Sequence, residues 1–192
     1  FFTISYFCQI SGRIEADPKR REMILQQLAK GVNTVQTSSL GRVFDTVAAI
    51  SGLGDYNHFD AQLPMALEAI IEPGVDECYG FELLGEPNGP LKLDLSRMIR
   101  ELIADVRNET PNGVVSAKFH NCLAAALLDM SKAARVSSKL NTVALSGGVF
   151  CNGYLSNRLV RLLKECDFDV LFNRIVPSND GGIFLGQAAI AA

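Results

Sequence analysis

The 192-residue sequence lacks several features that would place it in a broad class of proteins. It has no basic excess, because 18 Lys and Arg stand against 21 Asp and Glu, and so its charge gives no reason to bind nucleic acid. Its apolar opening is interrupted by Gln9 and Arg13, is too short to cross a membrane and has no basic n-region of a signal peptide. We therefore expect a cytoplasmic protein, with neither nucleic acid nor membrane among its partners.

Cysteine and histidine patterns typical of metal sites are also missing. The five cysteines form no C-x-x-C pair, so we expect reduced thiols and no structural zinc. His58 lies in a polar turn sequence, whereas His120 lies within a helical pattern, where a packed and hydrogen-bonded imidazole is expected. No serine lies in a G-x-S-x-G turn. The sequence therefore assigns no catalytic residue.

The sequence does contain a long series of helical patterns. Apolar residues recur at helical spacing in five segments, 17–31, 37–52, 58–74, 94–109 and 114–136. The expected N-caps are Asp17, Ser38 or Ser39, and Asp94, while Pro73–Gly74 is expected to stop the third helix. Segments 79–84 and 91–95 alternate apolar and polar residues around GEPNGP, which predicts a β-hairpin.

From residue 142 the pattern changes to strand, helix, strand and helix. The strands are TVALS (142–146) and DVLF (169–172), and the last helix is expected from residue 181. This order predicts parallel strands with crossover helices, and hence an α/β fold with a helix-rich N-terminal part. We expect residues 1–192 to form one folded lobe, with a helical part over 1–75 and a hairpin plus α/β part over 76–192.

Glycine pairs follow both of the predicted parallel strands. Gly147 and Gly148 come directly after the first strand, and residues 179–182 (NDGG) precede the last helix. Because ligands of parallel sheets sit at the carboxyl ends of the strands, we expect both bends to face one anion pocket. Asn152, at the head of the next helix, could hydrogen-bond a ribose or a base. The alternative is a tight strand-to-helix turn in which Asn152 is only a helix cap.

Asp180 is the only carboxylate in the second bend. It could be an N-cap, or it could be a metal ligand. One carboxylate does not hold a divalent ion, and neither histidine is clearly placed to help, so a complete metal site would need ligands from outside this chain. Cys151 lies beside the first bend and is expected to have no chemical role.

Four motifs together resemble a known family. They are TSSLGRVFD (37–45), FHNCLA (119–124), ALSGGVFCN (144–152) and VPSNDGGIFLGQA (176–188). In this order and at these separations they resemble the C-terminal end of HypF-type carbamoyltransferases, the maturation enzymes of nickel–iron hydrogenases. The resemblance runs from about residue 17 to the end. It implies one lobe of an actin-like (ribonuclease H-like) ATPase fold, related to the enzymes that place threonylcarbamoyl on tRNA.

The resemblance also implies an activity. HypF proteins use ATP to convert carbamoyl phosphate into carbamoyl-adenylate, and they transfer the carbamoyl group to the C-terminal cysteine of the partner HypE. Carried over by motif, Gly147 and Gly148 would line the nucleotide, Asn152 would contact its adenosine part and Asp180 would be one ligand of a divalent metal, which could be Fe, Zn or Mg. The implied partners are the HypE tail and the rest of the parent HypF chain.

Departures from the family leave alternatives open. Gly153 stands where the family usually has a bulky basic residue, and the family's histidine metal ligands and Asp-Gly phosphate loop would lie upstream of residue 1. The chain has no initiating Met, so we expect a piece of a longer protein that alone binds nucleotide weakly and turns nothing over. It could instead be a tRNA threonylcarbamoyltransferase-like protein, or a non-catalytic lobe whose glycine turns are purely structural.

Overall fold

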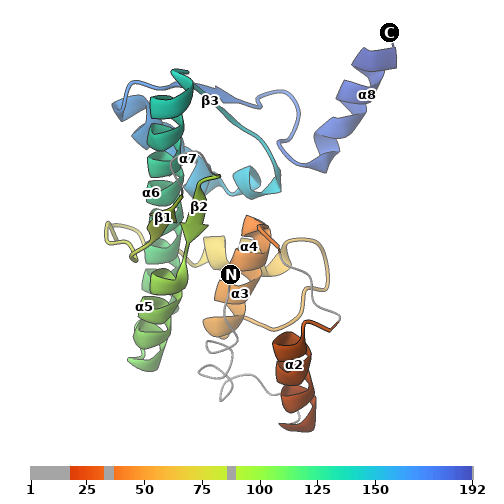
Figure 1. Cartoon of the computed structure of the whole chain (residues 1–192), viewed down its shortest axis with the longest axis vertical. Coiled ribbons are helices and arrows are strands. Elements are labelled where there is room, and N and C mark those ends of the chain that lie inside the picture. Colours follow the sequence, from red (N-terminus) through yellow and green to blue (C-terminus); the bar gives the residue numbers. More distant parts are fainter. Residues whose placement is uncertain (1–17, 33–36, 86–89, 192) are drawn as a thin grey trace.

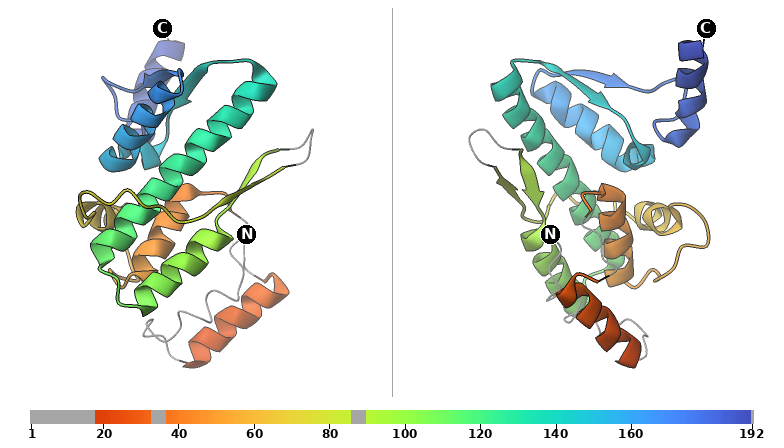
Figure 2. Two further views of the ribbon diagram at one scale, coloured as in Figure 1. Left: turned by 90° about the vertical axis from the view of Figure 1, so that its left-hand side faces the viewer. Right: turned by 45° about the vertical axis from the view of Figure 1, so that its right-hand side comes forward.

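The computed structural model describes residues 18–32, 37–85 and 90–191, and its longest element is the 27-residue helix α6 (Asn112–Ser138). Helices α3 (Leu40–Ile50), α4 (Gln62–Ala69) and α5 (Ser96–Arg107) gather around the first part of α6. Figures 1 and 2 show the α/β part at the other end of α6, with α2 (Pro18–Lys30) at the far end of the molecule from α8.

The core forms because α3, α4 and α5 bury apolar side chains in one cluster with α6. The periodic stripe predicted on α5 is buried, and it consists of Met98, Ile99, Leu102, Ile103 and Val106. Phe44 of α3 meets Phe119 of α6 edge to face, with ring centroids 4.9 Å apart. Each such side chain stabilises the fold by roughly 1.5–3 kcal/mol when it leaves water. One continuous cluster of buried residues therefore joins the helical part to the α/β part.

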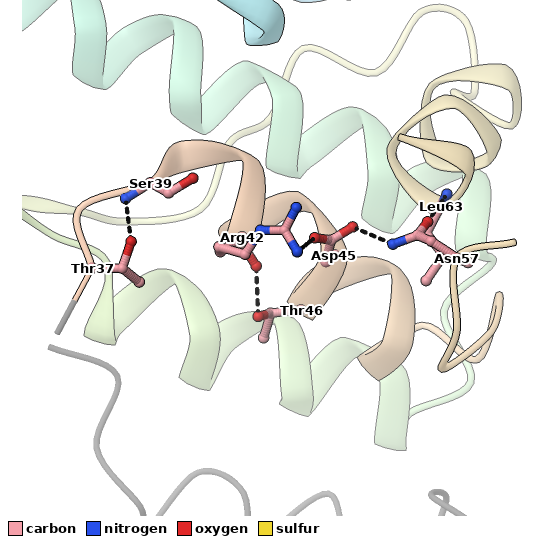
Figure 3. A network of polar contacts seen from close by, with 7 residues as sticks. All are labelled: Thr37, Ser39, Arg42, Asp45, Thr46, Asn57 and Leu63. Atoms are coloured by element: carbon pink, nitrogen blue, oxygen red, sulfur yellow. Dashed lines mark hydrogen bonds and ion pairs between the residues drawn. The ribbon is translucent and has the colours of Figure 1, made fainter. Parts of the chain in front are cut away.

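The predicted helix starts are only partly correct. Helix α2 begins at Pro18 and ends before Gly31, as expected, but its predicted cap Asp17 lies outside the described residues. Ser39 occupies the cap position of α3, yet its side chain makes no capping hydrogen bond. Instead, the Ser39 N–H donates to Oγ1 of Thr37 at 3.1 Å (Figure 3), so the predicted serine cap is wrong in its chemistry.

The third and fourth helices differ from their predicted bounds. Helix α4 begins at Gln62 rather than near residue 58, because Ala61 is left-handed with φ of 58°. It ends at Ala69, before the predicted Pro73–Gly74 stop. Helix α5 starts one residue later than expected, although Asp94 Oδ1 still accepts the Ser96 N–H at 2.8 Å.

Both predicted strand pairs are present. Strands β1 (Glu82–Leu84) and β2 (Lys92–Asp94) form the expected antiparallel hairpin, and part of its loop, 86–89, lies outside the described residues. Strands β3 (Thr142–Leu145) and β4 (Asp169–Phe172) pair in parallel, with Thr142 opposite Asp169 and Leu145 opposite Phe172. The crossover helix α7 (Gly153–Glu165) packs on α6. The predicted strand–helix–strand unit is confirmed.

The chain ends in two short elements. The 3-10 turn η2 (Asp180–Gly182) leads into α8 (Ile183–Ala191), which starts two residues later than predicted and buries none of its side chains. None of the helices in the described part of the chain is long and apolar enough to span a bilayer.

Candidate functional site

The two glycine bends meet at one edge of the β3–β4 pair. The Gly147 N–H donates to the carbonyl of Ser178 at 2.8 Å, and a Cβ placed on Gly148 would lie 3.8 Å from Cβ of Asn179. Cys151 Sγ lies 3.6 Å from Ser178 Oγ. Because parallel neighbours end at the same edge of a sheet, the loops that follow them come together. The prediction that the two bends lie together at one edge of the sheet is confirmed, whereas the anion pocket that they were expected to face stays a prediction.

The first bend leaves backbone donors open to a ligand. Gly147 has φ of 106°, a conformation that side chains rarely adopt, and a Cβ there would meet nothing within 4 Å. Gly148 then starts the 3-10 turn η1 (Gly148–Cys151). The N–H groups of Gly148 and Val149 find no acceptor among the described residues, as is usual for the first residues of a helical turn. Two adjacent donors can therefore bind an anion here.

Asn152 joins the end of η1 to the start of α7. Its Oδ1 accepts the Leu155 N–H at 2.8 Å, and its Nδ2 donates to His120 Nε2 at 2.9 Å. The interpretation of Asn152 as a helix cap is confirmed. Its contact with an adenosine stays a prediction, and the hydrogen bonds to Leu155 and His120 leave one N–H of its amide for such a contact.

His120 is fully buried and supports Asn152 from the core. Its Nδ1 lies 2.8 Å from the Ser116 carbonyl, which fixes the proton on Nδ1 and leaves Nε2 to accept from Asn152. Burial lowers the pKa of His120 to about 4, against the opposing effect of the hydrogen bond to Ser116. The rings of Phe44 and Tyr154 contact the imidazole edge to face. The expectation of a packed, hydrogen-bonded histidine is confirmed.

Asn179 organises the second bend. Its Oδ1 accepts the Gly181 N–H at 3.0 Å, and its carbonyl accepts the Gly182 N–H at 3.0 Å. The interpretation of Asp180 as the cap is therefore wrong, because Asn179 holds that position. A Cβ on Gly182 would lie 2.9 Å from the Pro177 carbonyl, so this bend has no room for a side chain there.

Asp180 is left exposed beside the first bend, with no capping role. Within the described ranges, no three His, Cys, Asp or Glu side chains come close enough together to hold a metal ion. Both ring nitrogens of His120 are hydrogen-bonded, to Ser116 and to Asn152, and His58 is exposed in the loop before α4. The described residues alone therefore do not fit a divalent metal, and Asp180 as one ligand of a shared site stays a prediction.

Comparison with known proteins shows which family the chain belongs to. The family model described as "Carbamoyltransferase, Kae1-like Domain, second subdomain" matches residues 3–187. The chain belongs to the HypF family of carbamoyltransferases. A HypF of Synechocystis is 32% identical over 179 residues, which are 93% of this chain and 22% of that protein. A solved structure of full-length HypF in a phosphate- and nucleotide-bound form is 36% identical and superposes with a TM-score of 0.89, covering 98% of this chain and 24% of that chain.

These matches confirm the predicted fold, one lobe of the actin-like architecture. The chain spans about a quarter of the length of these HypF relatives. A tRNA N6-adenosine threonylcarbamoyltransferase of Ehrlichia ruminantium is also similar, at 32% identity, but over only 83 residues, 40% of this chain. The similarity to HypF proteins thus extends over more than twice as much of the sequence.

Gly153, where the resemblance leads us to expect a bulky basic residue, lies beside a carboxylate from another helix. Glu68 Oε1, from α4, accepts the Tyr154 N–H at 3.0 Å, and a Cβ on Gly153 would lie 3.5 Å from the same oxygen. A carboxylate is favourable at this place because the N-terminal end of a helix is positive. The basic residue that the resemblance leads us to expect at this position in HypF proteins would lie beside Glu68. Sequence reasoning missed Glu68, which no motif marks.

The HypF motif TSSLGRVFD forms the start of α3, and α3 contacts η1. Figure 3 shows that its polar residues hold the neighbouring loop. Asp45 lies 2.9 Å from Arg42 Nη1 and accepts from Asn57 Nδ2 at 3.0 Å, while Asn57 Oδ1 accepts the Leu63 N–H at 2.8 Å. The motif therefore fixes α4 against α3, and with it the helix that carries Glu68.

Proposed function

We propose that this chain is the nucleotide-binding lobe of a longer carbamoyltransferase that acts in nickel–iron hydrogenase maturation. The longer protein makes carbamoyl-adenylate from carbamoyl phosphate and ATP and transfers the carbamoyl group to the C-terminal cysteine of HypE. The observation that carries the proposal is the meeting of the two glycine bends, where the N–H groups of Gly148 and Val149 have no acceptor among the described residues. A HypF relative solved with phosphate and nucleotide supports it.

The chemistry suits a site made mainly of backbone. A carbamoyl–phosphate anhydride has a good leaving group, so the protein needs chiefly to position it and to offset charge on the phosphate oxygens. Gly147 and Gly148 line the nucleotide, and the unpaired N–H groups of the bend face its phosphates. Asn152 is the proposed contact to the adenosine part, through the second N–H of its Nδ2 group or the second lone pair of Oδ1, since the bonds to His120 and Leu155 use only one of each.

Asp180 is the proposed contribution of this chain to a divalent metal, with the remaining ligands supplied by the rest of the longer protein. Such an ion, when bound, offsets negative charge on phosphate oxygens. Because no cluster of ligands exists within the described ranges, the isolated chain is expected to bind nucleotide weakly and to transfer nothing. Isothermal titration of the isolated chain with ATP and magnesium tests this, and sub-micromolar affinity would contradict it.

Radiolabelled carbamoyl transfer to HypE by the longer protein tests the whole proposal. Asp180→Ala should abolish transfer and lower the metal content, whereas Asp60→Ala, a matched change at an exposed aspartate before α4, should alter neither. If Asp180→Ala retains full transfer and unchanged metal content, the functional interpretation of the NDGG bend fails.

A non-catalytic structural lobe is the second candidate. The observation that favours it is the commitment of Asn152 to a helix cap and of the Gly147 N–H to Ser178. The same Asp180→Ala experiment separates the two, because a purely structural lobe has no use for an exposed carboxylate that caps nothing.

A further inference from the structure

Helix α7 borders a hollow that the candidate site does not use. The hollow has a volume of about 330 Å³ and is lined by Tyr154, Asn157, Arg158 and Arg161. Because these residues are spaced three and four apart, they project from one side of the helix. The two arginines lie roughly 8–12 Å along the helix axis from its first residue, where α7 leaves the first bend. The hollow is therefore separate from the backbone donors of that bend.

Arg158 is the unusual residue of this hollow, because its charge is mostly buried and poorly paired. Its side chain is only 19% exposed, and its one ion pair among the described residues joins Nη1 to Asp76 Oδ1 at 3.5 Å. The Asp76 side chain is 89% exposed, so it contributes little to holding the charge. A guanidinium has five N–H donors, and burying it is costly unless acceptors satisfy them. An anion in the hollow would supply these acceptors.

The other lining residues can also serve an anion. Arg161 lies 3.8 Å from Glu165, but both side chains are 61% exposed, so this ion pair is weak and Arg161 can exchange it for another partner. The exposed Asn157 amide has no hydrogen-bond partner in the described ranges. The Tyr154 hydroxyl donates to Asn121 Oδ1 at 2.9 Å, which fixes the ring as one wall. Two guanidiniums and an amide thus meet at one hollow that no carboxylate lines.

We propose that this hollow binds a small phosphorylated molecule, at a site distinct from the nucleotide site proposed at the glycine bends. Two guanidiniums match the charge of a phosphate monoester, which is about −1.5 to −2 near pH 7. A carboxylate carries a single charge, which one guanidinium already matches. The volume lies near the lower end of the range usual for small-molecule sites, so it suits a molecule smaller than a nucleotide.

The alternative role for these cations is to complement the negative C-terminal end of α7. That effect falls off within the last turn of a helix. It accounts for Lys164, which lies in the last turn, but not for Arg158, which lies seven residues before the end of α7 at Glu165. The burial of Arg158 beside a hollow therefore needs another explanation, and an anion provides it.

Titration of the chain with inorganic phosphate, followed by NMR at constant ionic strength, tests the site. The amide resonances of residues 157–161 should shift, and Arg158→Gln should raise the dissociation constant about tenfold or more, because charge-assisted hydrogen bonds are lost. Arg161→Gln, at an exposed residue, should also raise it and keeps the test valid if Arg158→Gln does not fold. The matched control is Lys164→Gln, which removes the same charge from an exposed position of α7 outside the hollow and should change the constant less than about twofold.

Three results would overturn the proposal. One is the absence of any shift at residues 157–161, whether or not the amides of Gly148 and Val149 respond. Another is equal weakening by Lys164→Gln, which would mean that phosphate senses only the diffuse charge of the helix. The third is acetate binding as tightly as phosphate, which would assign the hollow to a carboxylate. The proposed function is tested separately by Asp180→Ala, which lies outside the hollow, so either proposal can fail without the other.

Discussion

Acid should destabilise this chain through His120, and the effect can be worked out from the structure. The buried imidazole donates from Nδ1 to Ser116 and accepts at Nε2 from Asn152, so it has no place for a second proton. Burial lowers its pKa to about 4, whereas an exposed histidine titrates near 6.5. Between the two pKa values, His120 is therefore protonated in the unfolded chain and neutral in the folded chain.

The sign and size follow from linkage. Above about pH 6.5 the imidazole is neutral in both states, and its contribution to the free energy of unfolding is fully present. As the pH falls from about 6.5 to about 4, the unfolded state gains a proton first, and stability is lost. The loss amounts to about 3 kcal/mol over the whole window, and to about 2 kcal/mol by about pH 5. That is a large part of the stability of a typical domain.

Urea unfolding of the chain and of His120→Gln at several pH values measures this term. Asp94 and Glu101, whose pKa values are lowered by hydrogen bonds from Ser96 and from the Gly80 N–H respectively, also lose stabilising interactions in acid, but they do so equally in both proteins. The difference between the two unfolding free energies therefore isolates His120. The advantage of the unmodified chain at about pH 7.5 should shrink by about 2 kcal/mol at about pH 5.

His58→Gln is the matched control, because it removes the chain's other imidazole from an exposed position and leaves the His120 contacts intact. The His58→Gln chain should keep the acid-dependent loss that His120→Gln removes. A difference between the unmodified and His120→Gln chains that stays constant from about pH 7.5 to about pH 5 would refute the reasoning. It would mean that the imidazole accepts a proton in the folded chain and that the Asn152 contact is not the one described.

Three further changes probe the bend and its support in the isolated chain, each by urea unfolding. Gly147→Ala should lower the free energy of unfolding by roughly 1–3 kcal/mol, because φ of 106° strains any side chain. Gly186→Ala, where nothing lies within 4 Å of a Cβ, should not lower it. Asn152→Ala should lower the free energy of unfolding by about 2–4 kcal/mol, since it removes the cap of α7 and leaves the buried His120 Nε2 without a donor. Tyr154→Phe removes the hydrogen bond to Asn121 and should lower the free energy of unfolding by about 1 kcal/mol. An unchanged free energy of unfolding would show that the hydroxyl hydrogen-bonds equally well to water in the unfolded chain.

The periodic patterns were enough to predict most of the fold. The apolar stripe of α5 and the strand–helix–strand order after residue 142 are properties of short segments, and local spacing determines which side faces a core. The meeting of the glycine bends was predictable for the same reason, because parallel strands bring their carboxyl ends to one edge.

Several of the details that failed depend on partners distant in sequence. The start of α4 is set by left-handed Ala61 and by Asn57, which caps Leu63 and is itself held by Asp45, twelve residues earlier. Glu68 reaches the start of α7 across 86 residues. No local pattern encodes such contacts. The choice of Asn179 over Asp180 as cap was a local alternative that spacing alone could not decide.

The two sides of the candidate site differ in how they are held, and this difference bears on what the chain can do alone. On the inner side, Asn152 is fixed by His120 from α6, and Tyr154, two residues later, is fixed by Glu68 from α4, so the first bend is anchored to the buried core. On the outer side, Asp180 leads into α8, which buries no side chain against the described part of the chain. A rigid half-site and an unanchored half-site cannot bind a nucleotide and a metal in one fixed geometry, because the cost of ordering the second half opposes binding. Because that cost falls on the isolated chain, we expect the proposed activity to require the longer protein.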